Sequence, residues 1–150
     1  MLHVNASVDA EVEPVEIFSI VSDLGTYPDW LDIVGSAQAV PADPDDGGSP
    51  AWLIDLRAQM GPLRRSKRLR MERTVCKAPL SARFERRELD GRSHSDWVLT
   101  ATIEELGETT RLTMDLLYAG SLWLPALDRI LREEIRRSSA RLVSLVEQRH

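Results

Sequence analysis

Three successive runs of residues between positions 73 and 120 alternate apolar with polar side chains. Such alternation is typical of antiparallel strands that bury one face, because successive side chains along a strand point to opposite faces. Asp90-Gly91 separates the first two runs and predicts a two-residue turn, since a type I′ turn needs positive φ at both central positions. Counting outward from this turn places Phe84 opposite Trp97.

A second tight turn, at Gly107-Glu108, joins the second run to the third and places Trp97 opposite Tyr118. Side chains directly opposite each other in an antiparallel pair share a face. The two hairpins therefore predict one apolar wall, made by Phe84, Trp97, Leu99, Met114, Leu116 and Tyr118. A sheet with one apolar and one polar face must be covered on its apolar side.

Residues 122–148 are the predicted cover, because their apolar positions form one stripe at about 100° per residue. A helix start within residues 121–124 leaves Pro125 in the first turn, where proline is tolerated. The apolar members of the stripe are Leu124, Leu127, Leu131, Ile135, Leu142, Leu145 and Val146. Ser138 lies at the centre of the stripe and Glu134 close beside it. These polar residues predict that helix and sheet do not pack tightly along their whole length.

The rest of the chain predicts a strand, two short helices and three further strands, in that order. Residues 2–8 alternate as a half-buried strand, and Pro14 suits the first turn of a helix. The apolar face of that helix is Val15, Phe18, Ile20 and Val21. A shorter helical segment covers residues 26–31, and strands cover residues 34–40, 52–60 and 65–75.

Composition fits a soluble globular domain: 43% of the 150 residues are hydrophobic and the net charge is −5. The single cysteine, Cys76, excludes an internal disulfide, and no signal-peptide pattern precedes Val4. No apolar stretch approaches the ~18 to 20 residues that span a bilayer. We therefore expect one domain over residues 1–150, located in the cytoplasm, with no nucleic-acid partner. In the basic run at residues 64–70, strand alternation is expected to send Arg64, Arg68 and Arg70 outward into solvent, while Arg65 and Lys67 share the face of Leu69.

Four segments carry a resemblance to a known family. They are residues 9–18, Asp23-Leu24 with Tyr27-Pro28-Asp29-Trp30, residues 107–112, and the terminal helix. With the element order above, the whole chain resembles the START-like helix-grip superfamily, which includes the plant pollen-allergen fold. The run Tyr27-Pro28-Asp29-Trp30 resembles its bacterial polyketide cyclase/dehydrase-type branch.

The resemblance implies an α+β helix-grip fold, in which a curved seven-stranded antiparallel sheet wraps around a long C-terminal helix. Two short helices follow the first strand, and a deep apolar cavity lies between sheet and helix. Members of the superfamily bind lipids, sterols, polyketides or hormones. Some catalyse cyclisation or dehydration, without a shared catalytic motif.

A row of large apolar side chains, most of them aromatic, crosses four predicted strands and is a candidate wall for this cavity. It consists of Met71, Phe84, Trp97 and Tyr118, and Trp52 extends it. Flat apolar side chains suit a bound ligand, but the same row also fits a filled core, and both interpretations stay open. The candidate ligand-binding residues are Trp52, Ile54, Leu56, Leu69, Met71, Phe84, Arg86, Ser95, Trp97, Leu99, Met114, Leu116, Tyr118, Leu127, Leu131, Glu134, Ile135 and Ser138.

Arg86 is a charge on the predicted apolar face, where an unpaired charge is costly. The predicted register places it opposite Ser95, and Glu134 is the obvious carboxylate on the covering helix. One interpretation is a polar cluster of these three residues that orients the polar end of an apolar ligand. The alternative is a rim arginine that reaches water, with Glu134 paired to Arg137 or Ser138 on its own helix.

Catalytic residues are sparse. The three histidines have no metal-binding spacing, and we expect neither a metal nor a cofactor. Glu134, Arg86 and Tyr118 are the candidates for acid–base chemistry.

The sequence therefore favours binding of a hydrophobic small molecule, such as a lipid, a polyketide or another aromatic or isoprenoid-like ligand. It leaves open a cyclase, aromatase or dehydratase that uses the same cavity. It also leaves open lipid delivery, with residues 41–50 or 122–125 touching a membrane, and either a monomer or a homodimer.

Overall fold

The computed structural model describes residues 2–119 and 127–149. The elements, in chain order, are β1 (Leu2–Ala10), α1 (Pro14–Val21), the 3₁₀ helix η1 (Leu24–Asp29), β2 (Val34–Val40), the 3₁₀ turn η2 (Pro44–Asp46), β3 (Ala51–Met60), β4 (Leu63–Lys77), β5 (Ser81–Arg86), β6 (Trp97–Glu105), β7 (Thr110–Tyr118) and α2 (Leu127–Arg149). The seven strands form one antiparallel sheet in the order β1-β7-β6-β5-β4-β3-β2. The predicted α+β helix-grip fold is confirmed.

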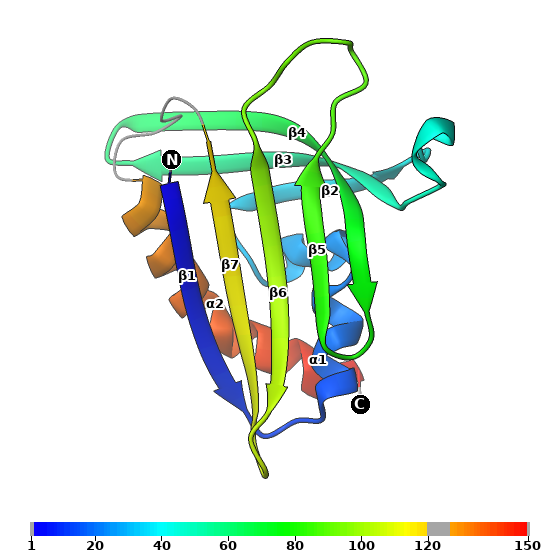
Figure 1. Ribbon diagram of the computed structural model, residues 1–150. Helices are drawn as coiled ribbons and strands as arrows, with labels where there is room; N and C mark the ends of the chain where they lie inside the picture. The colour runs from blue at the N-terminus through cyan, green and yellow to red at the C-terminus, as the bar shows by residue number, and fades with distance from the viewer. Residues whose placement is uncertain (1, 120–126, 150) are drawn as a thin grey trace.

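The sheet is strongly curved (Figure 1). β4 is 15 residues long and runs beside β3 at one end before it bends down beside β5. A bulge between Arg73 and Val75, where β4 pairs with β5, accounts for this bend, because an extra residue in one strand increases the local twist. α1, η1 and α2 lie on the concave side of the sheet, so sheet and helices enclose one core.

α1 begins at a capping box in which Glu13 and Glu16 cap each other's backbone, with Pro14 in the first turn. Its buried face consists of Ile17, Phe18, Ile20 and Val21. Val15 is 61% exposed, so its predicted place on this face is wrong. Ile17, which the prediction left out, lines the buried face instead, four residues before the correctly predicted Val21 on the same side of the helix.

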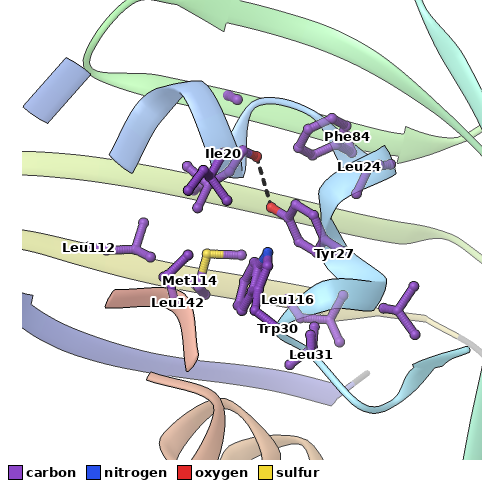
Figure 2. Packing of buried hydrophobic residues seen from close by; sticks show 14 of the residues in the cluster. Ile20, Leu24, Tyr27, Trp30, Leu31, Phe84, Leu112, Met114, Leu116 and Leu142 are labelled. Carbon is purple, nitrogen blue, oxygen red and sulfur yellow. Dashed lines mark hydrogen bonds between the residues drawn. The ribbon is translucent and has the colours of Figure 1, made fainter. Parts of the chain in front are cut away.

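Two side-chain hydroxyl groups of η1 form hydrogen bonds to the end of α1. The Tyr27 hydroxyl donates to the Val21 carbonyl at 2.8 Å, as Figure 2 shows, and the Thr26 hydroxyl donates to the Ile20 carbonyl at 2.8 Å. These bonds satisfy carbonyls at the end of α1 that have no partner within the helix. They hold η1 over the concave face of the sheet.

The β6–β7 hairpin has the predicted register, with Trp97 opposite Tyr118. The predicted β5–β6 register is wrong by two residues, because Phe84 lies opposite Leu99 and not opposite Trp97. A shift of two residues preserves the face to which each side chain points. Phe84 and Trp97 are therefore still buried on the same side of the sheet.

Residues 87–96 connect β5 to β6 in place of a two-residue turn. The local turn does form, because Gly91 has a φ of 73° and the Asp90 carboxylate accepts a hydrogen bond from the Arg92 N–H at 2.9 Å. The strands do not close onto it, since the Arg87 N–H donates to the Arg70 carbonyl of β4 at 2.9 Å. Pairing with the neighbouring strand thus overrides the local turn.

α2 is the predicted covering helix, with Leu131, Leu142 and Val146 buried. Ser138 is 0% exposed and Glu134 is 5% exposed, so these polar residues pack against the rest of the protein. The predicted helix start at residues 121–124, Leu124 included, and the side chain of Leu127 lie outside the described part of the chain.

Candidate functional site

An apolar cavity of about 80 Å³ lies between the concave face of the sheet, η1 and α2. Its lining consists entirely of apolar and aromatic side chains: Leu24, Tyr27, Trp30, Leu31, Ile33, Val34, Ile54, Leu56, Leu69, Met71, Trp97, Leu99, Met114, Leu116, Leu131 and Ile135. Figure 2 shows how η1 and the segment after it face β7, with Tyr27, Trp30 and Leu31 set against Met114 and Leu116.

The cavity brings together ten of the predicted site residues. They are Ile54, Leu56, Leu69, Met71, Trp97, Leu99, Met114, Leu116, Leu131 and Ile135. Sequence reasoning missed the wall formed by residues 24–34, which contributes six lining side chains. The available signal was the aromatic pair Tyr27 and Trp30, whose rings lie 4.7 Å apart in the structure.

Three aromatic residues of the predicted row lie beside the cavity and do not line it. Trp52 packs edge-on against Phe84 with ring centroids 5.8 Å apart. Tyr118 packs against Trp97 at 4.5 Å. The contact with Tyr118 supports the lining residue Trp97 from outside the cavity.

Tyr27 is a titratable side chain in the lining, and its hydroxyl is already committed to the Val21 carbonyl. Burial raises the pKa of the Tyr27 phenol strongly, and the nearby Asp23 charge raises it further. The phenol therefore stays protonated across the physiological pH range.

Two side chains of the lining each carry a buried nitrogen atom that lacks a hydrogen-bond partner, although no polar atom contributes to the surface of the cavity itself. The two nitrogens are the indole Nε1 atoms of Trp30 and Trp97, on side chains that are 2% and 3% exposed. More than nine in ten buried polar groups in proteins are paired, so two unpaired donors around one small cavity are unusual.

Arg86 lies next to the cavity, opposite the lining residue Met71. Its Nε donates to the Glu88 carboxylate at 2.9 Å, and its Nη1 donates to both the carbonyl and the hydroxyl of Ser95 at 3.3 Å. The side chain is only 8% exposed, so the arginine is a paired, buried charge and does not extend into water. The predicted contact between Arg86 and Ser95 is present, with Glu88 in the place predicted for Glu134.

Lys67 lies on the same side of β4 as Leu69 and adds a second positive charge near Arg86. Burial lowers the pKa of the Lys67 ammonium, Arg86 lowers it further, and Glu88 opposes both effects. This end of the cavity therefore carries excess positive charge around one carboxylate.

Glu134 links α2 to the segment between η1 and β2. The hydrogen-bond partners of its carboxylate do not include Arg86. The Glu134 carboxylate accepts hydrogen bonds from the Asp32 N–H at 2.6 Å and from Arg137 at 3.0 Å. The Ser138 hydroxyl donates to the same carboxylate at 3.4 Å, and Arg141 pairs with the Asp32 side chain. The predicted polar cluster of Arg86, Ser95 and Glu134 is thus divided between two places.

Within residues 2–119 and 127–149, no three metal-binding side chains come together, and no helix is long and apolar enough to cross a membrane.

A curved antiparallel sheet that grips a long helix over an apolar cavity defines a helix-grip protein of the START-like class. The sequence matches the family described as "Polyketide cyclase / dehydrase and lipid transport" over residues 1–147, and the chain belongs to this family. The search of curated proteins gave no match.

Several solved structures are similar in fold. A START superfamily protein from Mycobacterium smegmatis is 21% identical, with a TM-score of 0.72 over 99% of both chains. A conserved protein from Geobacillus kaustophilus is 15% identical, with a TM-score of 0.72 over 99% of this chain and 97% of that chain. A protein from Chromobacterium violaceum is 16% identical, with a TM-score of 0.65 over 97% and 96% of the two chains. At these identities the similarity concerns the fold alone.

Proposed function

We propose that this protein binds a hydrophobic small molecule in the cavity between the sheet and α2. The observation that carries the proposal is the lining, in which every side chain is apolar or aromatic. Binding sites for small molecules are typically concave and mainly apolar, with a few polar groups that fix orientation. The family to which the chain belongs is consistent with a ligand of this kind.

The size of the cavity implies that the walls move when a ligand enters. Its volume of about 80 Å³ is well below the ~300 to 1,000 Å³ that is usual for small-ligand pockets. The segment between η1 and β2 forms one wall of the cavity. It is attached to α2 through Asp32, whose N–H donates to the Glu134 carboxylate and whose side chain accepts a hydrogen bond from Arg141. We infer that an entering ligand displaces this segment from α2.

The polar groups beside the cavity suit the polar end of such a ligand. Arg86 and Ser95 already form a hydrogen-bonded pair next to Met71, and Lys67 adds positive charge nearby. A ligand with one polar end and a lipid, polyketide or isoprenoid-like body fits this arrangement. Among the described lining residues, only Tyr27 has a side chain that can lose a proton. Because burial raises the pKa of its phenol, Tyr27 is better suited to packing against a ligand than to proton transfer.

The proposal is tested by titrating apolar probes, from benzene to naphthalene, while tryptophan fluorescence is recorded. Leu99→Phe puts extra atoms into the cavity, whereas Val98→Phe changes the neighbouring residue on the opposite face of β6 and serves as the matched control. We expect saturable binding that Leu99→Phe weakens and Val98→Phe leaves unchanged. Equal effects of the two substitutions, or no saturable binding, would contradict the proposal.

A further inference from the structure

The β3–β4 hairpin concentrates positive charge. Residues 56–71 contain five arginines, one lysine and no acidic residue, so this segment carries a net charge of +6. Because the whole chain carries −5, the other residues together carry −11. The hairpin is therefore strongly basic on a molecule that is otherwise acidic.

Most of this charge is exposed and is not neutralised within the molecule. Arg64, Arg65 and Arg68 are exposed, and no carboxylate of the described chain lies within ion-pair distance of them. Arg57 pairs with Asp55 at 2.9 Å, but its side chain is 65% exposed and stays accessible to a second anion.

Arg70 is an exception, because it is only 7% exposed. Its guanidinium pairs with the Glu72 carboxylate at 3.0 Å and donates to the carbonyls of Arg87 at 2.9 Å and Pro41 at 3.3 Å. The predicted place of Arg70 in solvent is therefore wrong, since the backbone at these two positions covers it. The accessible charge belongs to residues 57–68, which we call the basic ribbon.

The basic ribbon projects beyond the rest of the sheet. β2 pairs with β3 only as far as Leu56, and β5 pairs with β4 only from Met71 onward. In Figure 1 the two strands continue together past β5 and β6 to a turn at the upper left. A hollow of about 520 Å³ on the ribbon is lined by Arg57, Ala58, Gln59, Arg64, Arg65 and Ser66. The ribbon thus offers a cationic surface to a partner outside the molecule.

The basic ribbon also adjoins the wall that is proposed to open for a ligand. Leu56 and Leu69, which flank the ribbon on its two strands, line the apolar cavity. A second hollow, of about 200 Å³, is bordered by Arg57 of the ribbon and by Asp32 and Glu134, the pair that attaches this wall to α2. A partner on the ribbon therefore lies next to the proposed entrance.

An anionic lipid bilayer suits both features of this surface. Its headgroups attract exposed arginines, and the acidic remainder of the molecule is repelled, so the charge asymmetry turns the ribbon toward the bilayer. Its interior dissolves apolar molecules of the kind that the cavity is proposed to bind. Nucleic acid would satisfy the charge alone, and residues 56–71 contain no aromatic side chain on which a base could stack.

We propose that the basic ribbon docks this protein on anionic lipid bilayers, with the wall at Asp32 beside the membrane surface. Docking goes beyond the proposed function and does not depend on it. The link between docking and ligand exchange rests on the proposed function.

The test is co-sedimentation with vesicles made of equal parts of phosphatidylserine and phosphatidylcholine. Arg64→Gln combined with Arg68→Gln is expected to weaken binding by about 5-fold for each arginine removed. Arg92→Gln combined with Arg132→Gln is the matched control, because it removes the same charge from two exposed arginines outside the ribbon. The control pair is expected to leave binding unchanged.

Two comparisons with the wild-type protein need no substitution, in case a variant fails to fold. Binding is expected to weaken as the NaCl concentration rises and to be absent with vesicles of phosphatidylcholine alone. Equal binding to both kinds of vesicle, equal losses in the two variant pairs, or tighter binding to a DNA duplex than to the anionic vesicles would overturn the proposal.

Benzene binding separates this inference from the proposed function. The affinity for benzene is expected to be the same in wild-type protein and in the variant with Arg64→Gln and Arg68→Gln, because neither arginine lines the apolar cavity. Loss of docking with benzene still bound would leave the proposed function standing. Docking without benzene binding would overturn the proposed function alone.

Discussion

Replacing Val34 with isoleucine adds one methylene to the cavity wall at the start of β2. Both residues are β-branched, so the intrinsic preference for a strand is kept. A void of about 80 Å³ costs the fold about 2 kcal/mol, at roughly 24 cal/mol per Å³. One methylene that enters the void contributes about 0.8 kcal/mol through burial. We therefore expect Val34→Ile to raise the free energy of unfolding by up to about 0.8 kcal/mol.

The assay is thermal unfolding, in which this change corresponds to an increase in Tm of about 2 to 3 °C for a chain of this size. Because the added methylene occupies ligand space, the affinity for benzene is expected to fall in the same variant. Stability and binding should thus change in opposite directions.

Ser138→Leu is the contrasting variant, because Ser138 is 0% exposed but does not line the cavity. It is expected to lower the free energy of unfolding by about 1 to 3 kcal/mol, the usual cost of overpacking. A loss of this size in Val34→Ile would refute the reasoning, since it would mean that the wall at Val34 is already closely packed.

Further predictions concern the charged residues. Glu134→Gln is expected to lower the free energy of unfolding in urea by about 1.5 to 3 kcal/mol, because charged hydrogen bonds are lost; a roughly 10²-fold loss of turnover with unchanged stability would instead indicate a general acid or base. Arg86→Met is expected to destabilise by about 3 to 5 kcal/mol, and adding Glu88→Gln should recover part of the loss, as a urea double-mutant cycle would show. Arg111 lowers the pKa of the Asp9 carboxyl, so this pair stabilises the fold above the unfolded pKa and the effect is lost as pH falls. Asp9→Asn should therefore lose less stability than the wild type between about pH 5 and about pH 2.

The sheet could be predicted where the turn and its strands agree. Gly107-Glu108 closes directly onto β6 and β7, so local turn chemistry and strand pairing give the same register. Asp90-Gly91 also turns, but Arg87 pairs with the β4 backbone, and the predicted β5–β6 register is displaced by two residues. The alternation of residues in β5 and β6 does not indicate that Arg87 pairs with β4, so this effect could not be predicted from the sequence.

The site was predictable on the sheet and on α2, but not on the wall formed by residues 24–34. Alternation identifies inward-facing residues such as Leu99 and Met114, because a strand has a period of two. Trp30 belongs to a short irregular segment without such a period, and its burial depends on how η1 is fastened to α1. Arg86 and Glu134 both face inward as expected, but Arg86 pairs with Glu88 and Glu134 pairs with Asp32. The alternation of a sequence predicts the face on which a side chain lies and does not predict its position along that face.

The most direct test of the central claim is a titration of methyl-labelled protein with benzene, followed by NMR. Saturable shifts are expected at methyl groups of the lining, such as Leu31, Ile54 and Leu131. The exposed leucines Leu80 and Leu89 provide the internal control and are expected not to respond. Shifts confined to exposed methyl groups, or shifts that never saturate, would contradict the claim that the sheet and α2 enclose a ligand-binding cavity.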